Sequence, residues 1–142
     1  MRTLSCFVFA AGLLWSASAN AQKAEVPYEP YSPARLAELR AEGRPVLVNY
    51  TAAWCVSCQV NDRVALSTKG VAAAMKAHNV AYLKADWTKK DADIAAELAR
   101  YGRAGVPLYL VYGADGGDGV ILPSILTEGI VVKALNKAAA KG

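Results

Sequence analysis

The chain has 142 residues, a length that suits a single domain of ordinary size. Hydrophobic residues make up 54% of it, enough to build a core, although residues 1–21 contribute part of that figure. The formal net charge of +4 is mild and is spread along the chain. No basic block of the kind that binds nucleic acid is present, so we expect no nucleic-acid partner.

Residues 1–21 have the layout of a secretory signal peptide. Arg2 gives a positive start, an apolar run follows, and small residues stand at Ala19 and Ala21. We expect cleavage after Ala21. The alternative is a membrane anchor, but the apolar run falls short of the ~20 residues that span a bilayer. Export would place the mature chain in the periplasm, an oxidising compartment where disulfides persist.

The next segments predict a leader, a helix and a strand. Residues 22–31 hold two prolines and several charges, which is typical of an extended leader. Ser32 and Pro33 then fit the N-cap and first position of a helix, which ends at Gly43. Residues 45–51 (PVLVNYT) are apolar nearly throughout, as in a strand that is buried on both faces.

The rest of the chain continues this alternation. The patterns predict, in order, a helix from about Cys55 through Val64, a break at Ser67 and Thr68, a helix over 69–77, a strand over 80–85, a helix over 91–101, a strand over 107–112, a glycine-rich turn over 113–119, a strand over 120–122 and a helix over 127–140. A helix joins the first two strands and a short turn joins the last two. We therefore expect an α/β domain over 32–142, with a mixed sheet and helices on both faces.

Cys55 and Cys58 stand two residues apart in the stretch WCVSC, directly after the first predicted strand. As a structural disulfide the pair would close a loop of about four residues and add roughly 2 kcal/mol, the least effective placement for a staple. As a zinc site it lacks ligands, because such sites take four and only His78 could join the pair. A two-thiolate copper(I) site stays open, since soft ligands suit that ion.

A reactive centre fits the pair better. At the start of a helix, the unpaired N–H groups and the helix dipole stabilise a Cys55 thiolate. The thiolate is the nucleophile in disulfide exchange. Cys58 lies one turn further on, close enough to attack a mixed disulfide and release the partner. The sequence therefore predicts a redox-active dithiol.

Three stretches, TAAWCVSCQVNDRVALST, LKADWT and RYGRAGVPLYLVY, resemble the thioredoxin-like family. Within that family they are most similar to the C-terminal periplasmic domain of DsbD-type and ScsB-type proteins. The resemblance covers about Pro33 to the C-terminus. It implies a thioredoxin fold with a central sheet of four strands, or five, and a protein-disulfide reductase without cofactor or metal. Cys55 would be the attacking cysteine and Cys58 the resolving one.

The resemblance also implies roles for residues around the pair. Pro107 matches the family's cis-proline and would set the backbone of Val106 beside the disulfide, where an extended substrate could pair with it. A proline at the start of a strand is the competing interpretation. Trp54 would shape the rim of the site. Val56 and Ser57, between the cysteines, would contact substrate and resemble the dipeptide of the reductant branch.

Position 49 departs from the family pattern. Thioredoxins carry a buried aspartate six residues before the first cysteine, whereas this chain has Asn49, which cannot take up a proton from Cys58. Asp62, about two helical turns after Cys55, is the alternative acid, and DsbD-like domains are acidic there too. A carboxylate near the pair would raise a cysteine's pKa. A solvated helix charge is the competing interpretation of Asp62.

The leading hypothesis is an exported thiol:disulfide oxidoreductase that reduces, or relays electrons to, periplasmic protein disulfides. After residue 21 no apolar segment is long enough to span a membrane, so the electron donor would be a separate membrane protein. The alternatives are a dithiol oxidase or isomerase of the same fold, and a copper(I)-binding module without turnover. We expect a monomer.

Overall fold

A computed structural model describes residues 23–141, so the predicted signal peptide lies outside the described residues. Within this range one mixed sheet has the strand order β1-β3-β2-β4-β5. The strands are β1 (Glu29–Pro30), β2 (Val46–Thr51), β3 (Ala81–Asp86), β4 (Leu108–Tyr112) and β5 (Val120–Ile121). β1, β3 and β2 run parallel, while β4 is antiparallel to β2 and to β5. The expected mixed sheet is confirmed, with five strands.

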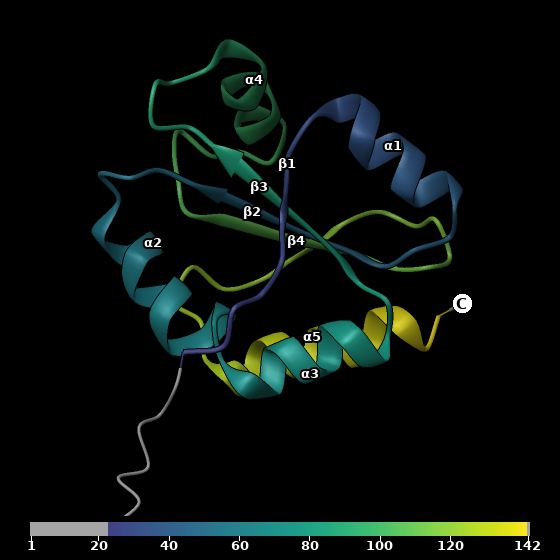
Figure 1. The fold of residues 1–142 in the computed structure, drawn as a ribbon. Coiled ribbons are helices and arrows are strands. Elements are labelled where there is room, and N and C mark those ends of the chain that lie inside the picture. The colour runs from purple at the N-terminus through teal and green to yellow at the C-terminus, as the bar shows by residue number, and fades with distance from the viewer. Residues whose placement is uncertain (1–22, 142) are drawn as a thin grey trace, which may run out of the picture.

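Helices cover both faces of this sheet, as the sequence predicted. They are α1 (Pro33–Ala41), α2 (Val56–Asn61), α3 (Lys69–Ala77), α4 (Ala92–Arg100) and α5 (Glu128–Ala139). Figure 1 shows α1 and α4 on one face, and α2, α3 and α5 on the other. No helix among residues 23–141 has the length and apolar character needed to cross a membrane.

Strand β2 lies at the centre of the core because its side chains belong to two apolar clusters, one on each face of the sheet. Leu47 is buried with residues of α3 and α5 on one face. Val46, Val48 and Tyr50 are buried with residues of α1 and α4 on the other. Burying one such aliphatic side chain contributes roughly 1.5–3 kcal/mol relative to leaving it exposed. The two-sided burial of β2 explains why residues 45–51 are apolar nearly throughout.

The segment predicted to be an extended leader is tied into the domain. The Ala24 N–H donates to the Ser67 carbonyl at 3.0 Å, and Val26 packs against the cluster that contains Leu47. Glu29 and Pro30 then pair with β3 as an edge strand. An edge strand tolerates proline, which has no N–H to donate. Residues 24–30 therefore complete the sheet and cover part of its face.

The helix after the cysteines contains a feature that the sequence did not predict. α2 continues directly into a π-helical segment, η1 (Asp62–Leu66), in which the Ser67 N–H donates to the Asp62 carbonyl at 2.8 Å. This wider turn ends at the predicted break, and Thr68 caps α3. Ala65 and Leu66, which are neighbours in sequence, are both fully buried.

Candidate active site

The cysteine pair lies where β2 gives way to α2, and the two residues form a disulfide. Cys55 is the N-cap of α2, and its Sγ accepts a hydrogen bond from the Cys58 N–H at 3.3 Å. The two Cα atoms are 5.2 Å apart. Only 7% of Cys55 and 2% of Cys58 is exposed. The sequence placed Cys55 at this helix terminus correctly, and a sulfur there receives a backbone N–H and the positive end of the helix dipole.

The loop before β4 lies beside the pair. The Val106–Pro107 peptide bond is cis, which confirms the prediction for Pro107. Val106 is partly buried against the small cluster of Ala52, Cys55 and Cys58. The sequence separates Val106 from the cysteines by about fifty residues, and the fold brings them into contact. The resemblance is thus correct about where Val106 sits, while its role toward substrate stays a prediction.

Trp54 forms a rim on this site and is held in place by the loop after β3. Its indole Nε1–H donates to the Thr88 carbonyl at 3.1 Å, while 52% of the residue stays exposed. The Trp54 ring also lies 6.0 Å from the ring of Trp87. A Cβ added at Gly105 would come within 3.3 Å of Trp87, so the loop that leads to the cis-proline passes close over that ring.

Thr88 is a contributor to the site that sequence reasoning missed. Its Oγ1 accepts a hydrogen bond from the Ala53 N–H at 2.9 Å. The Thr88 hydroxyl and backbone N–H both donate to Oδ1 of Asp86. These bonds, the one from the hydroxyl first, hold the pKa of Asp86 below its ordinary value of 3.8. Thr88, held by the last residue of β3, therefore fixes the two residues that precede Cys55.

A polar cleft of about 430 Å³ lies beside the loop that precedes Cys55, between α2 and the β1 edge of the sheet, and neither cysteine lines it. Its lining includes Asn49, Ala52, Gln59, Asp62 and Lys84. The cleft reaches from the loop before Cys55 to the end of α2, and side chains of both charges line it. It is the polar counterpart of the aromatic rim.

Asn49 is buried at the wall of this cleft, with 3% of its surface exposed. Its Nδ2 donates to the Tyr82 hydroxyl at 2.9 Å. Its Oδ1 has no hydrogen-bond partner among the described residues. Burial raises the pKa of Tyr82, so this hydroxyl is neutral at physiological pH. The position where the family has an ionisable acid is therefore occupied by an uncharged pair of side chains.

Asp62 also lines the cleft and is ion-paired. Its carboxylate oxygens are 3.7 Å from Nζ of Lys84 and 3.3 Å from Nζ of Lys23. The Ser67 hydroxyl donates to the same carboxylate at 3.2 Å. Asp62 is thus more than a solvated helix charge. The two lysines offset its negative charge, which limits the field that it can exert on Cys55.

The copper(I) alternative, which needs only the two sulfur atoms, stays a prediction. Among residues 23–141, no group of three or more His, Cys, Asp or Glu side chains is arranged to hold a metal ion. His78 ends α3, and its Nε2 lies 2.8 Å from Oδ1 of Asn136. The arrangement around Cys55 and Cys58 supplies two sulfur atoms and no further ligand of this kind.

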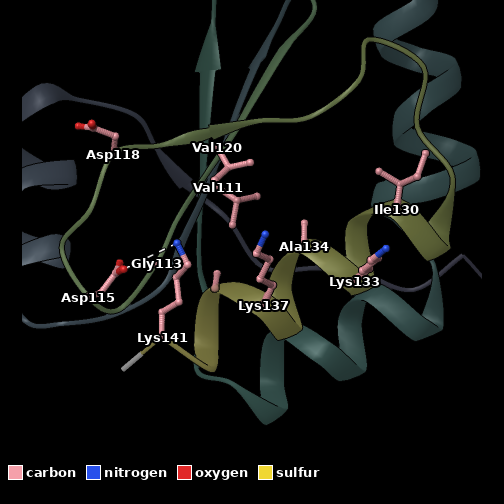
Figure 2. Close-up of a pocket in the computed structure, with 11 residues that line it drawn as sticks. Val111, Gly113, Asp115, Asp118, Val120, Ile130, Lys133, Ala134, Lys137 and Lys141 are labelled. Carbon is pink, nitrogen blue, oxygen red and sulfur yellow. Dashed lines mark ion pairs between the residues drawn. The ribbon is translucent and has the colours of Figure 1, made fainter.

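Another hollow, of about 220 Å³, lies between α5 and the strands β4 and β5. Figure 2 shows Val111, Val120 and Ala134 around it, with Lys133 and Lys137 on α5 and Lys141 just after the helix ends. Strand β4 starts next to the cis-proline and runs toward this hollow, so the two sites lie at opposite ends of the strand. Neither cysteine lines the hollow, and we assign it no part in the redox site.

Comparison with known proteins gives a family and a set of relatives. The model of the family described as "Thioredoxin-like" matches residues 27–114. The protein named thiol:disulfide interchange protein DsbD 1 of Pseudomonas aeruginosa is 39% identical over 85 residues, which are 60% of this chain and 14% of that protein. DsbD of Ralstonia nicotianae is 37% identical over 78 residues, 55% of this chain and 12% of that protein. The chain thus matches less than a fifth of the length of these relatives.

Solved structures agree on the fold. The oxidised C-terminal domain of DsbD from Neisseria meningitidis superposes with a TM-score of 0.62 at 21% identity, covering 79% of this chain and 99% of that one. A thioredoxin from Thermus thermophilus gives a TM-score of 0.64 at 23% identity, covering 82% of this chain and 89% of that one. The α/β thioredoxin fold that the resemblance implied is confirmed.

Proposed function

The chain belongs to the thioredoxin-like family, and from that premise we propose that it is an exported protein-disulfide reductase. Its Cys55–Cys58 pair would cycle between dithiol and disulfide, passing electrons to disulfides of other exported proteins. The observation that carries this proposal is the placement of Cys55 Sγ at the helix N-cap, where the Cys58 N–H donates to it. The relatives named for thiol:disulfide interchange support the same chemistry.

The reaction would start from the reduced pair. The Cys55 thiolate attacks one sulfur of a substrate disulfide, forms a mixed disulfide, and expels the other substrate sulfur as a thiolate that takes a proton from water. Cys58, once deprotonated, then attacks Cys55 Sγ and expels the second substrate thiolate. Two electrons have passed to the substrate, and the Cys55–Cys58 disulfide has formed. The pair returns to the dithiol state when a separate dithiol donor, which we propose is a membrane protein, reduces it.

The surroundings of the pair support each step. Cys55 is 7% exposed and Cys58 only 2%, so Cys55 is the more accessible residue of the pair. This asymmetry favours Cys55 as the attacking atom and Cys58 as the resolving one. With Asn49 in the buried position, no carboxylate stands there to take the Cys58 proton, which would pass to water.

Export is part of the proposal and rests on the signal-peptide pattern of residues 1–21. The periplasm is oxidising, so a reductant there needs an electron source, which is why the proposal includes a membrane donor. Fractionation of cells that express the full chain would test this part. Recovery of the protein, shortened by residues 1–21, in the periplasmic fraction is expected, and a full-length protein in the cytoplasm would contradict it.

Turnover of a protein disulfide tests the activity itself. The mature protein, reduced and resupplied with dithiothreitol, should reduce insulin disulfides well above the rate of dithiothreitol alone. The variant Cys55→Ser is the control and should fall to the background rate. Wild-type turnover that does not exceed this control would refute the reductase. Tight one-to-one copper(I) binding without turnover would favour the copper-binding alternative.

A further inference from the structure

The outward side of the helix after Cys55 carries apolar residues that no described part of the chain covers. Val56, Val60 and Val64 are 78%, 49% and 51% exposed. They are spaced four residues apart and so lie along one side of the helical segment α2–η1. The buried side of α2 includes Cys58 and Asn61, and Asn61, three residues before Val64, borders the row of valines.

Ile125 is held beside this row and is itself 78% exposed. Both peptide groups that flank it bond to Asn61 on α2. The Asn61 Nδ2 donates to the Ser124 carbonyl at 2.8 Å, and the Leu126 N–H donates to Asn61 Oδ1 at 3.0 Å. Asn61 Nδ2 also donates to the Tyr109 hydroxyl at 2.9 Å, which anchors it to the sheet. The loop around Ile125 is therefore fixed against α2 by a buried side chain.

We call Val56, Val60, Val64 and Ile125 the valine ridge. These exposed apolar side chains neither fill the core nor favour the helix in which the valines stand. Valine is a poorer helix former than alanine, lysine or glutamine, because its branched side chain loses χ1 freedom in a helix. The neighbouring exposed positions of the same segment hold polar residues such as Gln59 and Arg63. Single exposed apolar residues are ordinary, whereas a contiguous row beside a reactive disulfide is typical of an interaction surface.

We propose that the valine ridge is the docking surface for the protein partner that exchanges disulfides with Cys55, a proposal that rests on the proposed function. Val56 follows Cys55 directly, so a partner joined to Cys55 in a mixed disulfide must lie over the first residue of the ridge. From Val56 to Val64 the ridge extends for about 12 Å at the helical rise of 1.5 Å per residue. This length exceeds what a small disulfide can cover and suits a groove on a folded protein.

Charge specifies this partner further. Arg63 is exposed between Val60 and Val64. Arg103 lies next to the loop of Ile125, with its Nη1 3.4 Å from Ser124 Oγ. Neither arginine has a carboxylate within ion-pair distance in the part of the chain that the structure describes. A complementary partner would therefore present an apolar groove that is edged with acidic residues.

The double variant Val60→Ser/Val64→Ser tests the ridge while leaving the cysteines untouched. Two probes are compared, insulin as an acidic protein disulfide and oxidised glutathione as a small one. The variant should lose about five- to tenfold in kcat/KM for insulin because the ridge no longer buries apolar area against the protein. Its rate with oxidised glutathione and its reduction potential should stay unchanged. Val120→Ser, at a site of 50% exposure in the strand β5, is the matched control and should behave as wild type.

Each outcome separates the docking proposal from the proposed function. If the double variant turns over insulin as fast as the wild type, the docking proposal is wrong and the proposed reductase activity still stands. An equal loss with both disulfides would overturn the ridge as well, because it would show damage to the redox pair. No wild-type turnover of either probe would instead refute the reductase. Ridge-dependent binding of the wild type to vesicles of phosphatidylglycerol and phosphatidylethanolamine, with insulin kinetics unaffected, would replace the protein partner by a membrane surface.

Discussion

The two sides of the Cys55–Cys58 disulfide are built differently. On the rim side, Trp54 and the preceding backbone are held by hydrogen bonds to Thr88. On the cleft side, Asn49 keeps a buried oxygen without a partner among the described residues, and charged groups line the wall. On the rim side the Ala53 N–H and the Trp54 indole N–H both have hydrogen-bond acceptors, whereas the cleft is polar and open to water. We infer that the rim fixes the geometry of the exchange reaction, while the cleft, which neither cysteine lines, acts on the sulfurs only through the field of its charged groups.

The largest effect is expected at the boundary between the two sides, at Cys58. The variant Cys58→Ser should still attack a protein disulfide through Cys55 but cannot resolve the mixed disulfide. Turnover should fall to background, and a stable one-to-one adduct with insulin chains should accumulate on non-reducing gels. The adduct should be absent from the double variant Cys55→Ser/Cys58→Ser. An adduct that forms on Cys58 in Cys55→Ser, and not on Cys55, would reverse the roles of the two cysteines.

Asn49→Asp tests whether position 49, at the wall of the cleft, is shielded from water. A buried carboxyl has its pKa raised, because desolvation disfavours the charged form. The folded protein then binds this proton more tightly than the unfolded chain, so stability is lost as pH rises through the folded-state pKa. Urea unfolding should show a penalty of about 1–3 kcal/mol at pH 8 and a smaller one at pH 5. A penalty that is equal at both pH values would show that this side chain stays in contact with water.

Thr88→Val should weaken the rim. The substitution keeps the shape of the side chain but removes the hydroxyl that bridges the Ala53 N–H and Asp86. Leaving a backbone N–H without its partner costs about 1–3 kcal/mol when the group is buried, and less here because the contact is exposed. We expect a loss near 1 kcal/mol in urea unfolding, with the Trp54 fluorescence shifted toward that of a more solvated indole. Thr88→Ser retains the hydroxyl and should behave like the wild type.

Asp62→Asn should have a smaller effect on the cleft side. Removing a negative charge lowers the pKa of a nearby thiol, so the pKa of Cys55 should fall. The fall should be less than about half a unit, since Lys84 and Lys23 already offset the carboxylate. The thiolate absorbance of the reduced protein, titrated against pH, measures it. Lys84→Met should move the same titration upward. An unchanged titration in both variants would exclude Asp62 from the redox chemistry.

The smallest effect concerns Asp86 and acid pH. Its pKa lies below 3.8 because Thr88 donates to the ionised carboxylate. A depressed folded-state pKa adds stability that is present above the unfolded value and is lost as pH falls through the folded one. The difference in Tm between wild type and Asp86→Asn should therefore shrink as pH is lowered from 6 to 3. A difference that grows toward acid pH would contradict the assigned hydrogen bonds.

These two sides were not equally predictable from the sequence. The cysteine pair and the helix terminus at Cys55 lie in a local motif that the sequence shows directly, whereas the cis bond at Pro107 was implied only by the family resemblance. Thr88 acts through bonds to residues some thirty-five positions earlier, and Asn61 through bonds about sixty-five positions later. Such long-range contacts have no local pattern. They exist only once the strands have paired.

The same reasoning explains the misses in the fold. The strand β1 has two residues, too few for an alternating pattern, and it is a strand only because β3 offers it an edge. The π-helical η1 follows apolar positions that also fit an α-helix, so its extra residue per turn was not visible. In contrast, β2 was predicted from its apolar run, because a strand that is buried on both faces has apolar residues at nearly every position.

The central claim is that Cys55 and Cys58 form a reducing pair. The most direct measurement is the reduction potential of the mature protein, equilibrated in glutathione buffers and followed by thiol trapping. We predict a value of about −230 mV or lower, in the range of glutaredoxins and thioredoxin. A value near about −120 mV, that of the strong oxidant DsbA, would contradict the claim and make the protein a donor of disulfides.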